Sequence, residues 1–291
     1  SDAADLKRFP HQRHSNIWLP EHFEVAYQRI SQQLKTISAD TTYLGTVPHV
    51  PIAPFVRGIN EGGAPLAKDE RYFDYYTHFY IWDEEFIENR DNLPFLTREE
   101  IQLVDRTIDH YNTCIRRIAA DNGWKLFDVC NLLDQLAYRS TNGQPTYRFP
   151  EQLKQVFQAH PILSNPDHPF CRVLPSGELI LDTRYLRFRP DYAKYPIEER
   201  IQGGIVSLDG IHPTTLGYGL IAYEFLKTIG FQFNSSHAER NWWQTIVDAD
   251  PLLLNPPSSL GNLRNTLRFL SSNKAVRALH TIKNQLSGGH H

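Results

Sequence analysis

Asp209 and His212 have the residue types and the spacing that general base chemistry needs. They lie in the stretch Ser-Leu-Asp-Gly-Ile-His-Pro-Thr at 207–214, where one turn of chain can bring a carboxylate beside an imidazole. The carboxylate would fix the tautomer of the imidazole. It would also stabilise the imidazolium that forms when the histidine takes a proton from a nucleophile. The stretch therefore predicts a catalytic Asp-His pair.

The sequence around this pair predicts the elements that position it. An apolar run at 204–208 indicates a strand, and residues 214–229 have the pattern of a helix. Strands are also expected at 41–47 and 124–129, and helices alternate with them. This order predicts an α/β fold with a parallel sheet, right-handed crossovers and helices on both faces. The loops after the three strands would meet at the carboxyl edge of the sheet, where such folds bind ligands.

Two helices in the first half of the chain have clear signals. Residues 20–37 have apolar side chains at spacings of three and four, which is typical of an amphipathic helix. A longer helix is expected from Thr97 to Asn122, because Thr97 and Glu100 form a capping box before an apolar stripe. A short helix is expected at 132–138.

Other segments have weaker patterns. Residues 51–68 are rich in proline and glycine and predict a long loop, whereas the aromatic-rich segment 71–86 fits no single element. Residues 144–202 are expected to be irregular, with a hairpin around Ser176.

The chain divides into two predicted parts. Residues 1–235 would form the α/β domain. Residues 236–291 would form a helical C-terminal extension, with short helices near 259–271 and 274–285 after a Pro-Pro pair. Packing on the body of the protein or self-association through these helices is expected.

The composition excludes several classes of function. The 30 basic and 33 acidic residues form no basic block, which argues against nucleic acid as a partner. Three scattered cysteines without a C-x-x-C pair argue against a disulfide framework and a structural zinc site. No apolar run is long enough to predict a membrane span. No cofactor or metal is expected, and the compartment is left open.

Residues 203–219 resemble the last conserved block of the SGNH/GDSL hydrolases, a family of ester hydrolases. The resemblance covers roughly residues 15–235 and is specific at 203–219. It implies a three-layer α/β/α fold of the flavodoxin-like type and a Ser-His-Asp triad with an oxyanion hole. On this resemblance His212 would be the general base and Asp209 would orient it.

One part of the family pattern has no match. The chain contains no Gly-Asp-Ser, the family's nucleophile block. The family's Gly-x-Asn-Asp block has one near-match, Gly-Ile-Asn-Glu at 58–61, which lies well past the predicted strand. The order of the remaining blocks favours a chain that lacks an N-terminal segment with the serine. Such a chain would be completed by another segment or be poorly stable, because a central strand would be missing.

Three hypotheses for function follow. The first is a serine ester hydrolase of esterase or lipase-like type, acting on a small ester or acyl substrate through Asp209 and His212. The second is a non-catalytic relative that binds a lipid, a sugar or a protein. The third is a metal-dependent hydrolase using His49, His212 and Asp209. His49 follows the strand at 41–47, so it would either line the substrate pocket or hydrogen-bond a backbone carbonyl.

Overall fold

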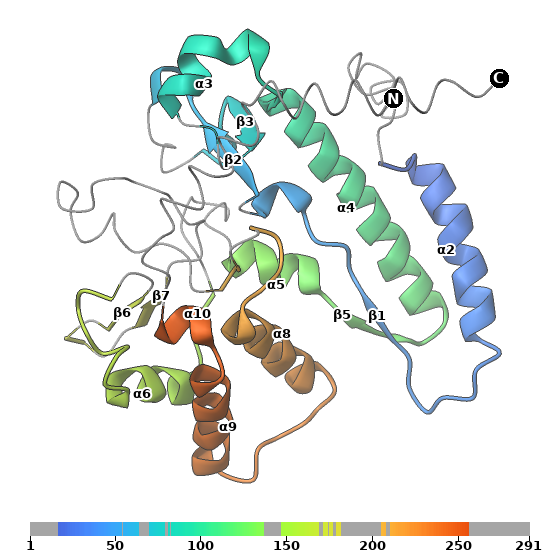
Figure 1. The fold of residues 1–291 in the computed structure, drawn as a ribbon. Helices are drawn as coiled ribbons and strands as arrows, with labels where there is room; N and C mark the ends of the chain where they lie inside the picture. Colours follow the sequence, from blue (N-terminus) through green and yellow to red (C-terminus); the bar gives the residue numbers. More distant parts are fainter. Residues whose placement is uncertain are drawn as a thin grey trace, which may run out of the picture.

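The computed structural model of this 291-residue chain is a mixed α/β structure with short strands and longer helices (Figure 1). It describes residues 17–53, 55–63, 70–78, 81, 83–136, 147–168, 171–173, 175–176, 179–181, 205–207 and 210–255.

Two helices from the first half of the chain lie side by side. They are α2 (Pro20–Leu34) and α4 (Arg98–Asp121) (Figure 1). The rings of Phe23 and Tyr111 stack between them with centroids 4.2 Å apart. The predicted capping box is confirmed, since Thr97 accepts from the Glu100 amide at 3.3 Å and the Glu100 carboxylate accepts from the Thr97 amide at 2.8 Å. The α2 helix ends one turn earlier than its apolar pattern predicts.

A parallel pair of strands joins this helical region to the rest of the protein. The strands β1 (Tyr43–Gly45) and β5 (Lys125–Phe127) pair with Leu44 opposite Leu126. Leu44 and Leu126 pack against α4 side chains. On the other face, the ring of Phe225 contacts the rings of Tyr43 and Phe127. Because alternate residues of a strand point to opposite faces, each face of the pair is covered by a different helix.

The predicted third parallel strand, at 204–208, is described only at 205–207. There Val206 forms an isolated antiparallel bridge with Pro213. The described residues thus have a mixed α/β fold with a two-stranded parallel sheet, and the three-layer flavodoxin-like order stays a prediction.

A separate antiparallel sheet forms after β1. Its strands are β2 (Val56–Ile59), β3 (Tyr75–His78) and β4 (Phe95–Thr97), in that order. The prediction of a continuous loop at 51–68 is wrong for β2, because its partner strand lies more than a dozen residues further on and local composition does not reveal it. Ile59, Ile81 and Phe86 form its small core.

Four short helices lie in the same part of the sequence. They are η1 (Val50–Ile52), η2 (Glu61–Gly63), α3 (Asp83–Asn89) and η3 (Arg90–Asn92). The helix α3 contacts η2 and η3, whereas η1 contacts α4.

The remaining helices enclose the largest apolar core. They are α5 (Val129–Leu136), α6 (Glu151–Ala159), α8 (Thr215–Thr228), α9 (Ser236–Asp248) and α10 (Pro251–Leu254). The fully buried side chains at its centre include Leu136, Leu153, Phe157, Leu216, Leu220 and Trp243. The segment predicted to be irregular contains α6, and its predicted hairpin is confirmed by antiparallel pairing of β6 (Cys171–Val173) with β7 (Leu179–Leu181).

The first part of the predicted C-terminal extension packs on this core. The helix α9 lies against α6 and α8 (Figure 1). Its Trp243 side chain is fully buried. The helices predicted at 259–271 and 274–285 lie outside the described residues. Within the described residues, the helices are too short or too polar to cross a membrane.

Candidate functional site

The residues around His212 form a tight loop that leads into α8. The Ser207 amide donates to the His212 carbonyl at 2.7 Å, and the Thr214 amide donates to the Ile205 carbonyl at 3.0 Å. Gly210 has a φ of 73°, a backbone conformation that glycine adopts without steric cost. Asp209 lies outside the described residues. The chain reversal before the helix is thus held by its own backbone.

The start of α8 is fixed by close packing. The Thr214 side chain accepts from the Gly217 amide at 3.1 Å and caps the helix. A Cβ on Gly217 would lie 2.2 Å from the carbonyl oxygen of Ile205, so only glycine fits here. The buried Asp250 carboxylate accepts from the Leu216 amide at 2.8 Å. These contacts hold the helix start, and with it the His212 loop, against residues 205–207.

The same loop meets the segment that follows β1. The Phe55 amide donates to the Gly210 carbonyl at 2.8 Å. The loop that bears His212 and the residue just before β2 are therefore neighbours.

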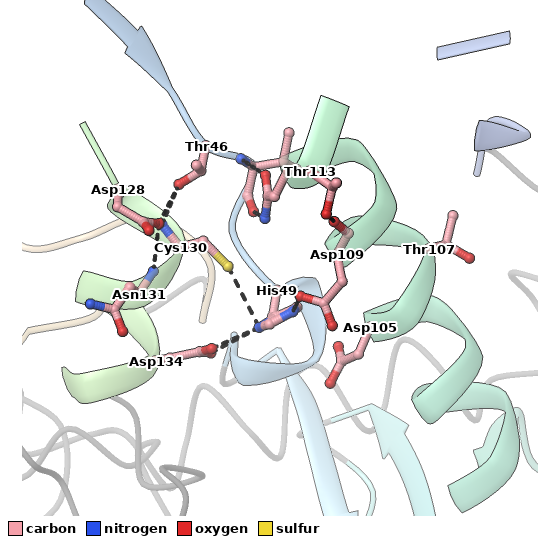
Figure 2. A network of polar contacts seen from close by, with 12 residues as sticks. Thr46, His49, Asp105, Thr107, Asp109, Thr113, Asp128, Cys130, Asn131 and Asp134 are labelled. Atoms are coloured by element: carbon pink, nitrogen blue, oxygen red, sulfur yellow. Dashed lines mark hydrogen bonds and ion pairs between the residues drawn. The ribbon is translucent and has the colours of Figure 1, made fainter. Parts of the chain in front are cut away.

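A second group of polar side chains gathers around His49 (Figure 2). His49 is 4% exposed and directly precedes η1. Its Nδ1 lies 2.8 and 3.0 Å from the two carboxylate oxygens of Asp134 and 3.6 Å from the Cys130 sulfur. Its Nε2 lies 3.3 Å from an Asp109 oxygen. The imidazole thus has a polar partner at each nitrogen.

Hydrogen bonds from three elements hold this cluster in place (Figure 2). The Thr46 hydroxyl donates to Asp128 and accepts from the Cys130 amide, both at 2.9 Å. The Asn112 side chain of α4 accepts from the Val47 amide at 2.7 Å and donates to its carbonyl at 2.9 Å. The end of β1, the start of α5 and the middle of α4 are therefore fixed relative to one another.

The surroundings of His49 are acidic. Burial favours the neutral imidazole, but hydrogen bonds to Asp134 and Cys130 and the nearby charge of Asp105 outweigh it and raise the pKa of His49 to about 10. Asp105 is 2% exposed and accepts from the Tyr72 hydroxyl at 2.8 Å. The carboxylates around His49 therefore favour its protonated form.

The structure describes two of the three residues predicted to act in catalysis or to line the substrate pocket. His212 and His49 are described and Asp209 is not. The group of potential ligand atoms that lie within 4.8 Å of one another consists of His49, Cys130 and Asp134, without His212. The sequence predicted that His49 would bond a backbone carbonyl or line a pocket. Its three side-chain partners, Asp134, Asp109 and Cys130, were not predicted.

Sequence reasoning missed Cys130, Asp134 and Asp109. The sequence did contain a signal for Cys130 and Asp134. Cys130 and Asp134 are four residues apart and directly follow a predicted strand, which places them on one helical face at the edge of the sheet. The helix prediction began at 132, two residues too late to include Cys130.

Residues 58–61, the near-match to the Gly-x-Asn-Asp block, make a hydrogen bond that joins two strands. Asn60 is 7% exposed, and its side-chain oxygen accepts from the Asp74 amide at 3.1 Å, next to the β2–β3 pairing. This contact joins the ends of two antiparallel strands.

Comparisons with protein-family models, curated proteins and solved structures gave no match for this chain.

Proposed function

We propose that this protein is a serine ester hydrolase of SGNH type in which His212 is the general base and Asp209 orients it. The observation that supports the proposal best is the set of hydrogen bonds that join residues 205–207 to His212 and Thr214, at the start of α8, and Gly210 to Phe55. In α/β folds, ligand-binding and catalytic residues lie on turns beside the carboxyl ends of parallel strands, and this is the position that we propose for His212.

Further support comes from the layers around the parallel pair. α4 covers one face of β1 and β5, and Phe225 of α8 covers the other. A helix on each side of parallel strands is the arrangement that the three-layer fold requires. Gly217 supports the same view, because its lack of a side chain brings α8 against Ile205.

The proposed reaction transfers an acyl group to a serine and then to water. His212 takes the hydroxyl proton as the serine oxygen attacks the ester carbonyl carbon. The imidazolium then gives this proton to the departing alkoxide, which leaves an acyl-enzyme. His212 next takes a proton from water as the water oxygen attacks the acyl carbon. The imidazolium then returns this proton to the serine oxygen as the acyl–serine bond breaks, which releases the acid and the free serine. The serine itself is not assigned, since the chain has no Gly-Asp-Ser.

Hydrolysis of small p-nitrophenyl esters by the complete natural protein tests this function. His212→Asn should lower kcat/KM about 10²- to 10⁴-fold, the usual contribution of a general base. Asp209→Asn should lower it as well, with the loss mainly in kcat. The matched control is His22→Asn, because His22 is an exposed histidine of α2.

Unchanged ester hydrolysis in His212→Asn would contradict the proposal. An absence of hydrolysis in the natural protein, with a folded His212 loop, would instead favour the binding-protein hypothesis.

A further inference from the structure

We propose that His49, Cys130 and Asp134 form a binding site for a divalent transition metal of the zinc class, with Asp109 supporting the histidine ligand. This proposal is independent of the ester hydrolase and of the His212 loop. One potential ligand atom from each of the three residues lies within 4.8 Å of the other two. Among the described residues this is the one such group of three or more histidine, cysteine and acidic side chains.

The distances between these atoms are close to those around tetrahedral zinc. Bonds of about 2.3 Å to sulfur and about 2.0 Å to nitrogen place the two ligand atoms about 3.5 Å apart. The His49 Nδ1 and the Cys130 sulfur are 3.6 Å apart. The Asp134 carboxylate, now 2.8 Å from Nδ1, would withdraw by about half an ångström to bind the same ion.

The second nitrogen of His49 is already oriented for metal binding. Nε2 faces an Asp109 oxygen at 3.3 Å, so with Nδ1 bound to the ion the Nε2 hydrogen would be donated to Asp109. Histidine ligands almost always donate their other N–H to a carboxylate, a carbonyl or a water molecule. This bond fixes the ring and makes it a better ligand.

Charge also favours a cation at this place. The carboxylates of Asp105, Asp109 and Asp134 lie around one imidazole, and the Arg71 guanidinium lies 3.5 Å from Asp134. Asp105 is almost fully buried, so its charge acts on the imidazole with little screening by water. A thiolate among the ligands selects zinc-class ions over magnesium and calcium. The side chain of Asp134, one of the proposed ligands, is 21% exposed, so the cluster is not wholly closed to solvent.

Sequence rules for zinc sites do not find this cluster. They look for cysteine pairs close together in the chain, whereas His49 lies 81 positions from Cys130 and 85 from Asp134. The ion would join the end of β1 to α5 directly and to α4 through Asp109. Its function would therefore be to clamp three elements together.

The chain contains a matched control for the cysteine. Cys171 is fully buried and its sulfur lies 3.2 Å from the Nδ1 of His168, so it is also a cysteine beside a histidine. It joins no third potential ligand at comparable distance among the described residues. The other nitrogen of His168 donates to the Leu253 carbonyl at 2.9 Å.

The test measures zinc and cobalt binding by the full chain. After growth with added zinc and exchange into metal-free buffer, elemental analysis should find one zinc per chain. Replacement by Co²⁺ should give a charge-transfer band from a cobalt–thiolate bond. Cys130→Ser should remove the band, whereas Cys171→Ser should keep both the band and the stoichiometry. The two C-terminal histidines, His290 and His291, are present in every variant and cancel in the comparison.

Two milder variants keep the test valid if Cys130→Ser does not fold. Asp134→Asn should weaken zinc binding at least tenfold, and Asp109→Asn should weaken it about 10- to 100-fold, the usual effect of removing a partner of a ligand. Circular dichroism of each metal-free variant should match that of the parent chain. The proposal is wrong if the parent chain binds no stoichiometric zinc. It is also wrong if the cobalt–thiolate band is absent, or if the band disappears in Cys171→Ser and persists in Cys130→Ser.

Discussion

The Phe55 amide donates a hydrogen bond to the Gly210 carbonyl across 2.8 Å, although the two residues lie far apart in the sequence. Phe55 follows β1 and η1, and Gly210 lies two residues before His212. This bond joins the residue just before β2 to the loop that bears the proposed general base. The position of His212 therefore depends on contacts that hold the two segments together.

Gly217→Ala should destabilise the protein. A methyl group at this position would lie 2.2 Å from the Ile205 carbonyl oxygen, so α8 would have to move away from residues 205–207. Overpacking of this kind costs about 1–3 kcal/mol, and thermal unfolding should show a lower Tm. Gly45→Ala is the control, since a Cβ there would meet no atom within 4 Å. Equal Tm values for the two variants would contradict the packing described for α8.

Trp243→Ala should show that α9 is part of the main fold. The indole is fully buried in the largest core, and removing it should cost about 3–5 kcal/mol. Trp18→Ala is a suitable comparison because Trp18 is 56% exposed. Urea unfolding followed by circular dichroism measures both. A Trp243→Ala cost as small as that of Trp18→Ala would mean that α9 is detachable.

Thr97→Ala should weaken α4 at its N-terminus. The variant removes one of the two bonds of the capping box and leaves the Glu100 amide without its acceptor. The expected cost is about 0.5–2 kcal/mol in the free energy of unfolding. Thr113→Ala removes only an exposed hydroxyl contact within the same helix and should cost less. The reverse order in urea unfolding would argue against the cap.

His168 should make the protein less stable in mild acid. Burial lowers its pKa, with a smaller contribution from His160, because both favour the neutral ring. The neutral ring donates from Nε2 to Leu253 and accepts from the Cys171 amide. A folded-state pKa below the unfolded value of about 6.5 gives stability that is present above that pH. This stability is lost as the pH falls through the folded pKa.

The free energy of unfolding at pH 7.5 and pH 5 measures this effect. As the pH falls between the two values, the free energy of unfolding should change more unfavourably in the parent protein than in His168→Gln. The lowered pKa of His78 and the raised pKa of His49 act in opposite directions over this range, but equally in both proteins, so they cancel in the comparison. An identical pH dependence in both proteins would contradict the role given to His168.

The sequence predicted those helices and strands that are determined by residues close together in the chain. The capping box of α4 and the hairpin of β6 and β7 follow from residues close together in the chain, and both predictions are confirmed. The parallel pairing of β1 and β5 also follows from the alternation of helices and strands.

Features made by distant residues were harder to predict. The strand β2 has its partner in the aromatic segment around Tyr75, and its own glycine-containing sequence looks like a loop. The cluster at His49 combines side chains from α4 and α5 with a residue after β1, and only the fold brings them together. Asp209 and both ends of the predicted strand at 204–208 lie outside the described residues, so the Asp209–His212 pair stays a prediction.

The most direct test of the central claim is the intact mass of the complete natural protein before and after reaction with a fluorophosphonate probe. The account predicts one probe adduct per chain on a serine. Adduct formation should be at least tenfold slower in His212→Asn and unchanged in His22→Asn. A natural protein that hydrolyses esters without forming an adduct, or an adduct that forms equally fast without His212, would contradict the account.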